Sequence, residues 1–104
     1  MSALPDEDKH AQDFVGPIVT RGEMSDAVAE AVRIDNPDRE IRVQEFDSYV
    51  RIEAKGTCLI TFDTMSDVLG RRFSFGDLEA NMPGFGGFIR NEDDHVRFLA
   101  SKKG

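Results

Sequence analysis

Two runs of alternating side chains, separated by one glycine, constrain the fold of this chain more than any other feature. In the first run, YVRIEAK (residues 49–55), apolar and polar residues alternate, with one face made of Val50, Ile52 and Ala54 and the other of Tyr49, Arg51, Glu53 and Lys55. A period of two is typical of a β-strand with one buried face. The second run, TCLITF (residues 57–62), follows Gly56, which predicts a bulge or a tight turn between two strands.

Four other segments have the patterns of strands. VGPIVT (residues 15–20) is short, and Pro17 places it at a sheet edge or at a strand start. IRVQEF (residues 41–46) alternates, and the turn residues Asp47 and Ser48 connect it to the run that begins at Tyr49. FIR (residues 88–90) and HVRFLA (residues 95–100) flank the polar sequence NEDD and predict a β-hairpin near the C-terminus.

One longer helix is predicted after the first strand. Its apolar residues recur at spacings of three and four, which places them on one helical face: Met24, Ala27, Val28, Ala31 and Val32. The sequence Asn36-Pro37 ends the helix, because the residue before a proline avoids helical backbone angles.

Two short helices are predicted between the second pair of strands and the C-terminal hairpin. The first has Thr64 as its expected N-cap and Gly70 at its end, and its inward residues are Met65, Val68 and Leu69. In the second, Ser74 and Asp77 resemble a capping box, and the shared apolar face consists of Phe75, Leu78 and Met82. We expect Pro83 to stop this second helix.

The order of elements predicts an α+β fold. It reads strand–helix–strand–strand and then helix–helix–strand–strand, with the helices packed on a mostly antiparallel sheet. The length of 104 residues favours one domain, which we expect over residues 14–101. Residues 1–13 are polar and predict a flexible tail that is either disordered or ordered by a partner, and residues 102–104 form a short C-terminal tail.

Charge and cysteine content limit the classes of partner. The net charge of −7 argues against binding to nucleic acid or to anionic membranes, and it is compatible with docking into a basic groove of another protein. Cys58 is the one cysteine, so we interpret it as a small buried hydrophobic residue in a reducing compartment. Because the sequence shows no signal peptide and no transmembrane run, a cytoplasmic protein is expected.

No catalytic or metal-binding constellation is recognisable in the sequence. His10 and His95 lie far apart in the sequence, and it contains no His-Glu-x-x-His motif and no pair of cysteines. The acidic run from Glu92 to Asp94 lacks the spacing of a calcium loop and is typical of a solvated turn. Cys58 has no candidate base beside it. We therefore expect no cofactor, no metal ion and no catalytic residue, as in a binding or regulatory module.

The stretch NMPGFGGFI (residues 81–89) is the strongest candidate for a functional segment. A phosphate loop is not expected, because the glycines follow a helix instead of leading into one, and no lysine or arginine is present. Two alternatives stay open for Phe85 and Phe88. They form an exposed contact patch supported by glycines, or they fill the core while the glycines let the chain turn.

Four segments in order resemble the effector (coupling or regulatory) proteins of bacterial multicomponent di-iron monooxygenases. They are VGPIVTRG, IDNPDREI, YVRIEAKG and LGRRFSFGDLEANMPGFGGFI, and the resemblance runs from Val15 to Phe98. The chain most resembles the effectors of toluene and related aromatic or alkene monooxygenases. The resemblance implies a cofactor-free, non-catalytic α+β protein that binds the di-iron hydroxylase component. It also implies ferredoxin and reductase components in the same system, and an effect on substrate and oxygen access, turnover and coupling.

The resemblance also implies which residues contact the hydroxylase. The segment after the last helix corresponds to Asn81, Met82, Pro83, Gly84, Phe85, Gly86 and Gly87. In this segment Asn81, Phe85 and Gly87 match the family pattern, whereas Pro83, Gly84 and Phe88 depart from it. A second candidate contact lies in the N-terminal part, at Gln12, Phe14, Val15, Gly16 and Pro17. The short N-terminal segment favours the aromatic or alkene branch over regulators of methane monooxygenase.

Two other classes of function are kept beside the effector hypothesis. One is a small enzyme or ligand-binding domain, which would need a concave pocket with convergent polar groups. The other is an acidic interaction module with a partner unrelated to oxygenation. Binding to a larger partner favours a monomer when the protein is free.

Overall fold

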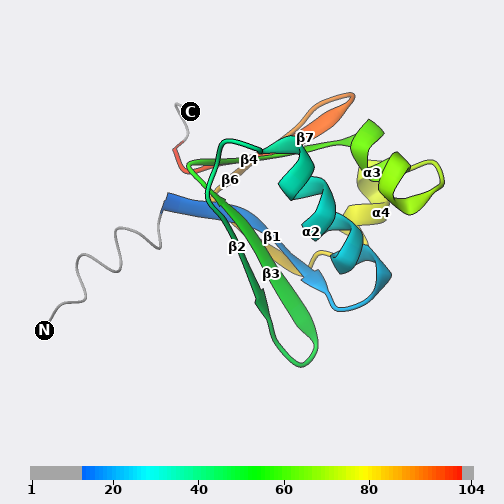
Figure 1. Cartoon of the computed structure of the whole chain (residues 1–104), viewed down its shortest axis with the longest axis horizontal. Coiled ribbons are helices and arrows are strands. Elements are labelled where there is room, and N and C mark those ends of the chain that lie inside the picture. Colours follow the sequence, from blue (N-terminus) through cyan, green and yellow to red (C-terminus); the bar gives the residue numbers. More distant parts are fainter. Residues whose placement is uncertain (1–12, 102–104) are drawn as a thin grey trace, which may run out of the picture.

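The computed structural model describes residues 13–101 and confirms the expected α+β fold. Figure 1 shows the elements in chain order: β1 (Phe14–Thr20), α2 (Glu23–Asp35), β2 (Ile41–Glu45), β3 (Tyr49–Lys55), β4 (Thr57–Thr61), α3 (Phe62–Leu69), α4 (Phe75–Glu79), β5 (Gly84–Gly86), β6 (Phe88–Asn91) and β7 (His95–Leu99). The short strand β5 has no counterpart in the predicted elements. The N-terminal tail expected over residues 1–13 lies outside the described residues except for Asp13, and the expected tail at 102–104 lies outside them entirely.

The strands form two antiparallel sheets. In the first sheet the order is β2-β3-β1-β5, and in the second it is β4-β7-β6. The chain crosses between the sheets three times: at Gly56 (φ 87°) after β3, through α3 and α4 after β4, and at Gly87 (φ 94°) after β5. The turn predicted at Gly56 is therefore confirmed, and it changes the sheet to which the chain belongs. At Gly87, a Cβ atom would lie 2.6 Å from the carbonyl oxygen of Leu99 and from Cγ1 of Val15.

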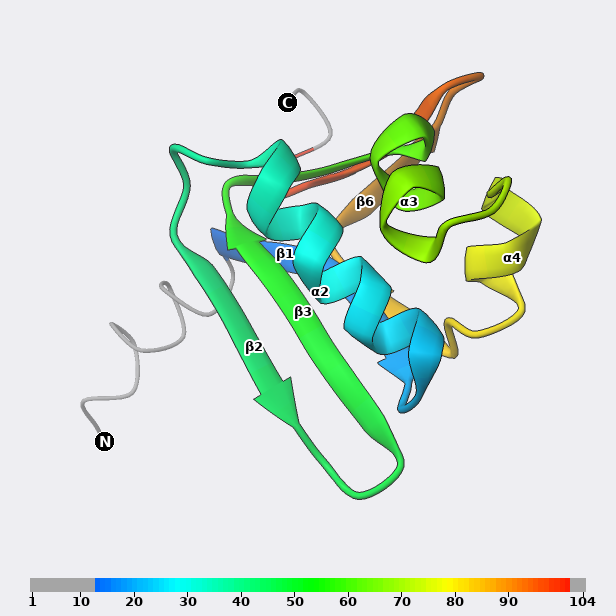
Figure 2. The same cartoon turned by 45° about the vertical axis from the view of Figure 1, so that its right-hand side comes forward.

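Helix α2 covers one face of the four-stranded sheet, as Figure 2 shows. We call this the inner face and the opposite one the outer face. The inner face carries Val50, Ile52 and Ala54 of β3, all buried as their alternation predicted. The predicted apolar face of α2 is confirmed too, because all five of its residues are buried against this sheet and the second one. The core is therefore an aliphatic layer between α2 and both sheets.

Helix α3 begins earlier than predicted. The hydroxyl of Thr61, not that of Thr64, caps it by accepting a hydrogen bond of 3.3 Å from the Thr64 N–H. The Thr64 hydroxyl instead donates to Asp35 over 2.7 Å, and the N–H of Thr61 donates to the same carboxylate. This link to the end of α2 fixes where α3 starts. The predicted end at Gly70 is confirmed, since that residue has a left-handed conformation (φ 74°).

The capping of α4 agrees with the sequence, since the Ser74 N–H donates to the Asp77 carboxylate over 3.0 Å. Leu78 of this helix is buried, with Phe75 and Met82 packed against the core. Cys58 is also fully buried, as predicted for a small hydrophobic residue. Burial, with a smaller contribution from Glu53 and Asp35, raises the pKa of the Cys58 thiol to about 12.

Candidate functional site

The segment 81–87 lies along an edge of the four-stranded sheet. Its first residue, Asn81, is held by two hydrogen bonds. The backbone oxygen of Asn81 accepts from the Thr20 N–H over 2.8 Å, and its side chain donates to the Asp77 carbonyl over 2.9 Å. After Met82 and Pro83, the chain pairs with β1 in the register Ile18↔Gly84, Pro17↔Phe85 and Gly16↔Gly86. The end of α4 is thus fastened to the end of β1, and β5 is held as an edge strand.

Two phenylalanine rings stand beside this edge. Phe85 is 42% exposed and Phe88 is 44% exposed, which are high fractions for such large apolar side chains. The Phe85 ring lies with one side against the buried Phe98, at a centroid distance of 5.7 Å. An open groove of about 670 Å³, which we call the corner groove, is lined by Phe85, Gly87, Phe88, Ile89 and Arg90. Of the two alternatives for these rings, the structure has the exposed one.

A second hollow lies on the outer face of the same sheet. This outer hollow, of about 260 Å³, is lined by Ile18, Tyr49, Arg51, Pro83 and Gly84. Tyr49 also stacks on the exposed Phe46 at a centroid distance of 4.6 Å. Because Pro83 and Gly84 belong to the candidate segment, the outer hollow and the corner groove flank the same stretch of chain.

The N-terminal candidates lie in a different environment. Gln12 is outside the described residues, and Phe14, Val15, Gly16 and Pro17 are buried within β1. The Phe14 ring is covered by the guanidinium of Arg42, 4.1 Å from the ring centroid. A Cβ atom on Gly16 would overlap the carbonyl oxygen of Ile52. These residues support β5 from the neighbouring strand. The prediction that Pro17 marks a sheet edge or a strand start is wrong, because β1 pairs with β3 on one side and with β5 on the other, and Pro17 lies in its middle.

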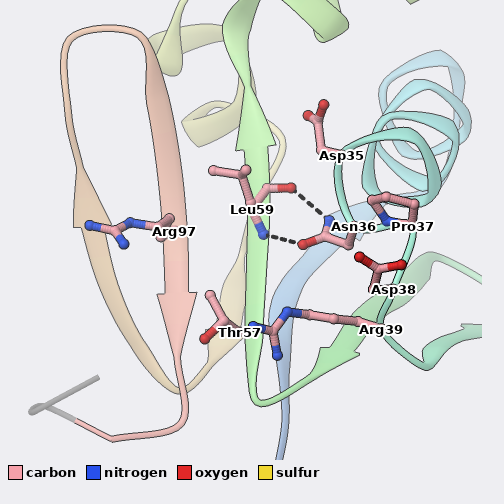
Figure 3. A pocket seen from close by; sticks show the side chains of 8 residues that line it. All are labelled: Asp35, Asn36, Pro37, Asp38, Arg39, Thr57, Leu59 and Arg97. Atoms are coloured by element: carbon pink, nitrogen blue, oxygen red, sulfur yellow. Dashed lines mark hydrogen bonds between the residues drawn. The ribbon is translucent and has the colours of Figure 1, made fainter.

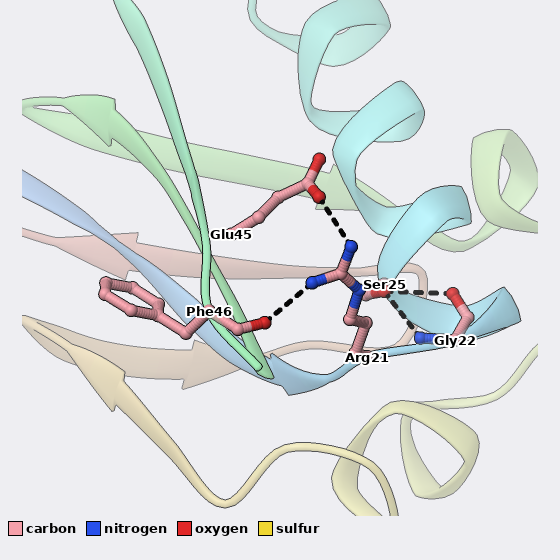
Figure 4. A network of polar contacts seen from close by, with 5 residues as sticks. All are labelled: Arg21, Gly22, Ser25, Glu45 and Phe46. Atoms are coloured by element: carbon pink, nitrogen blue, oxygen red, sulfur yellow. Dashed lines mark hydrogen bonds and ion pairs between the residues drawn. The ribbon is translucent and has the colours of Figure 1, made fainter. Parts of the chain in front are cut away.

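Polar contacts hold the exposed hairpin between β2 and β3 in place. Figure 4 shows Arg21 donating to the Phe46 carbonyl over 2.8 Å and pairing with Glu45 over 3.1 Å. At the start of α2, the Ser25 hydroxyl and the backbone of Gly22 exchange hydrogen bonds of 2.9 Å. The turn between β1 and α2 is thereby tied to the hairpin that carries Phe46 and Tyr49.

A third hollow, at the C-terminal end of α2, is mainly structural. It measures about 480 Å³, and Figure 3 shows its lining of Asp35, Asn36, Pro37, Asp38, Arg39, Thr57, Leu59 and Arg97. The Asn36 side chain is committed to both backbone groups of Leu59, at 2.9 Å each. Arg39 donates to the Lys55 carbonyl over 2.9 Å, and Asp35 holds the start of α3. These polar groups join the end of α2 and the loop after it to β3, β4 and α3, so their hydrogen bonds are made within the protein. The sequence indicated Asn36 only as a helix end.

Within residues 13–101, no group of three or more His, Cys, Asp and Glu side chains is placed to hold a metal ion. His95 begins β7, and its Nδ1 lies 2.7 Å from the carboxylate of the neighbouring Asp94. The same part of the chain contains no helix with the length and apolarity needed to cross a membrane. The features that the structure does gather around segment 81–87 are exposed rings, glycines and an open edge.

Comparison with known proteins identifies the family. The sequence model of the MmoB/DmpM family matches residues 13–99. The chain belongs to the MmoB/DmpM family. It is 37% identical over 87 residues to the effector subunit of the alkene monooxygenase system of Xanthobacter autotrophicus (strain ATCC BAA-1158 / Py2), covering 84% of this chain and 86% of the relative.

Solved structures with a similar fold agree with this assignment. A chain in a phenol hydroxylase–regulatory protein complex superposes with a TM-score of 0.70 and 30% identity, over 83% of this chain and 97% of the other. The soluble methane monooxygenase regulatory protein B has a TM-score of 0.66 at 18% identity, over 88% of this chain and 68% of the other, and it supports the fold.

The predicted family is therefore confirmed, as is the regulatory role. This MmoB/DmpM protein is a non-catalytic regulatory component of a multicomponent monooxygenase. Its alkene and phenol relatives agree with the expected aromatic or alkene type.

Proposed function

We propose that this protein binds the di-iron hydroxylase component of an aromatic or alkene monooxygenase and tunes its turnover and coupling. The observation that carries the proposal is the match over 97% of a chain in a complex of phenol hydroxylase with its regulatory protein. In this proposal the protein acts as a monomer in the cytoplasm, in a system that also contains ferredoxin and reductase components.

The proposed contact surface is the edge formed by segment 81–87 together with Phe88. Aromatic side chains that are partly exposed and supported by a rigid backbone are favoured anchors at protein interfaces. Phe85 and Phe88 meet this description, since β5 is paired with β1 and Gly87 makes a close turn against Val15 and Leu99. Because Asn81 is engaged in two hydrogen bonds, it positions the segment.

The N-terminal candidates take a supporting place in this proposal. Phe14 to Pro17 lie beneath the edge, and their burial leaves their side chains little surface to offer a partner. On the outer face, β1 offers Ile18, which is partly exposed, and Thr20, which is exposed. Contact through Gln12 remains a proposal from the family resemblance.

A protein without catalytic groups can change a reaction only through its partner. It does so by binding one conformation of the hydroxylase more tightly than another, and the population then shifts by that difference in affinity. A rigid edge with two aromatic anchors suits this task, because little ordering is needed on binding. The substrate and oxygen chemistry belongs to the hydroxylase.

Reconstitution tests the proposal. Hydroxylase, ferredoxin and reductase are assayed with and without this protein, and NADH oxidation is compared with product formation. We expect a large rise in turnover and tighter coupling when the protein is added in stoichiometric amount. Equal rates and equal coupling in both reactions would refute the function.

Phe85→Ala tests the contact surface within the same assay. We expect the concentration needed for half-maximal activation to rise by about tenfold or more, since anchor residues contribute 2 kcal/mol or more to binding. The matched control is Ile34→Ala, which removes an apolar side chain that is 53% exposed on α2. Circular dichroism should show both variants folded. Unfolding of Phe85→Ala would place that ring in the core and contradict the contact role.

A further inference from the structure

The outer hollow has a feature that segment 81–87 alone does not explain. Strand register places four residues in one row across the outer face: Gln44 on β2, Arg51 on β3, Ile18 on β1 and Gly84 on β5. A Cβ atom on Gly84 would lie 3.6 Å from Cδ1 of Ile18. Because Gly84 has no side chain, no atoms project from the outer face at this end of the row. Helix α2 covers the inner face, and no described helix packs over this row on the outer face.

Arg51 is the one charged residue in the lining of the outer hollow. Its Nε is shielded from solvent and has no hydrogen-bond acceptor. The nearest acidic residue along its own strand face, Glu53, is engaged by Arg42 over 3.0 Å. A shielded donor without an acceptor costs free energy in the free protein. Because Arg51 as a whole is only partly buried and lines the hollow, the rest of its guanidinium is the part that an incoming acceptor meets.

Only one other shielded side-chain nitrogen among residues 13–101 lacks a partner, Nε of Arg97. That residue lines the hollow at the end of α2, where Asp35 and Asp38 supply carboxylates to the same space. The lining of the outer hollow contains no acidic residue. Arg51 therefore differs from Arg97 in having no negative charge in its own hollow.

We propose that a carboxylate side chain of the hydroxylase component binds Arg51 in the outer hollow. This proposal rests on the proposed function and extends its contact surface from β5 across β1 to the hairpin of β2 and β3. Arginine binds carboxylates through two parallel hydrogen bonds, which fixes orientation as well as strengthening the contact. Tyr49, which lines the outer hollow, stacks on Phe46, so two aromatic rings lie next to one another at this hollow. Pro83 and Gly84 also line the outer hollow, and they belong to segment 81–87 of the first contact surface.

The negative net charge of the protein limits how a carboxylate can be recognised at Arg51. The chain carries a net charge of −7, so its long-range field repels an acidic surface. A carboxylate that binds here must be recognised at short range by Arg51 itself. The contact thus sets the register of docking, and its loss should appear mainly as faster dissociation.

The test compares three variants by titrating each against the hydroxylase and measuring binding and activation. Arg51→Met keeps the apolar stem and removes the donors, so we expect affinity to fall by about 10- to 100-fold. Arg51→Lys keeps the charge but not the paired hydrogen bonds and should recover only part of the loss. The matched control, Arg33→Met, removes an exposed arginine from the last turn of α2 and should bind like the wild type.

Thermal unfolding of the free variants separates recognition from structure. Arg51→Met should melt at the wild-type temperature or above it, because it removes a donor that the free protein leaves unpaired. If Arg51→Met unfolds, the proposal is judged on Arg51→Lys instead. Wild-type affinity of Arg51→Lys for the hydroxylase would then overturn the proposal. Wild-type affinity of a folded Arg51→Met overturns it as well, while the proposed function stands. If the wild-type protein does not bind the hydroxylase, both proposals fail.

Discussion

The two faces of the four-stranded sheet are built from the same strands but differ in how far their side chains are buried. The inner face, under α2, is closed, and Val19, Val50 and Ile52 on it have 5% exposure or less. The outer face is open at Ile18, Tyr49 and Arg51, and no described helix lies over it. Antiparallel sheets commonly pack one face and leave the other to solvent. In this protein, alternate residues of one strand therefore face a closed core and a partly open surface.

The outer face is not open along its whole length, because Glu53 and Phe14 are buried at one end. Glu53 is 5% exposed, pairs with Arg42 over 3.0 Å, and lies 3.6 Å from a Cβ position on Gly86. The glycines at this end let the carboxylate lie close to the backbone. The end near Tyr49 and Pro83 keeps its hollow. The face thus combines a filled end that supports β5 with an open end that offers contacts.

The largest expected effect comes from a paired comparison of two glycines. Gly16→Ala places a Cβ atom against the Ile52 carbonyl oxygen at a residue with φ of 152°. We expect it to lower the free energy of unfolding by at least about 3 kcal/mol, since backbone cannot move aside as a flexible side chain can. Urea denaturation followed by circular dichroism measures this.

Gly86→Ala is the matched control, because Gly86 is the register partner of Gly16 on β5. Its nearest neighbour would be the Glu53 carboxylate at 3.6 Å, an ordinary contact distance. We expect a change in stability within about 1 kcal/mol. Equal losses for the two variants would show that β5 is as closed as β1 and would break the distinction between support and contact.

Isoleucines on opposite faces provide the second test. Ile52→Ala removes a fully buried side chain from the inner face, and we expect a loss of about 2–5 kcal/mol in the free energy of unfolding. Ile18→Ala removes a partly exposed side chain from the outer face and should cost about 1 kcal/mol. The hydroxylase titration should show the reverse order, with affinity reduced several-fold only for Ile18→Ala. A loss of affinity in folded Ile52→Ala would mean that the inner face also senses the partner.

The third prediction uses Cys58 to report on the closed interior. Burial raises the pKa of this thiol from 9.0 to about 12 in the folded protein. The folded state therefore keeps a proton that the unfolded state loses, and stability falls as pH rises from 9.0 towards about 12. The slope approaches about 1.4 kcal/mol per pH unit. We expect wild type to lose stability faster than Cys58→Ala between these pH values, as measured by urea denaturation.

Parallel slopes for wild type and Cys58→Ala would contradict the closed interior. They would show that the thiol titrates in the folded state as it does in the unfolded chain. The difference between the two proteins is the relevant quantity, because it cancels the contribution of the groups that both proteins share. The loss of packing at residue 58 shifts the whole curve for Cys58→Ala but does not change its slope.

Periodicity in the sequence predicted the parts of the fold that depend on local pattern. The alternation in residues 49–55 identified both faces of β3, and the helical spacing from Met24 to Val32 identified the buried face of α2. The capping residue at Ser74 and the turn at Gly56 were also recognisable, because both depend on a few neighbouring residues. The exposed state of Phe85 stayed open because it depends on Phe98, which comes 13 positions later.

Features that depend on distant parts of the chain could not be predicted. Strand β5 is a Gly-Phe-Gly sequence with no pattern of its own, and it forms because β1 offers an edge. Asp35, 26 residues before Thr61, determines where α3 starts. The unpaired nitrogen of Arg51 is likewise a consequence of what Ile18, Pro83 and Gly84 place around it. The candidate segment was therefore located from sequence by family resemblance, and its geometry required the structure.

The smallest expected effect concerns a charge pair at the start of α2. Glu23 accepts two hydrogen bonds from Arg71, of 3.0 and 3.1 Å, and this hydrogen bonding together with the positive charge lowers the pKa of the Glu23 carboxyl. Any stability from the pair is present above the unfolded-state pKa and is lost as pH falls through the lowered folded value. Both side chains are more than half exposed, so solvent screens the pair.

Arg71→Gln should therefore raise the pKa of Glu23 towards its ordinary value, measured by an NMR titration, while the unfolding midpoint at neutral pH stays nearly unchanged. Hydroxylase activation should also remain at the wild-type level, because Glu23 belongs to the helical layer and not to the outer face. This variant therefore tests whether exposed residues away from the outer face have any effect on hydroxylase activation. A clear loss of activation with a wild-type melting temperature would show that the helical layer also contacts the hydroxylase, and the separation of stability from recognition would then fail.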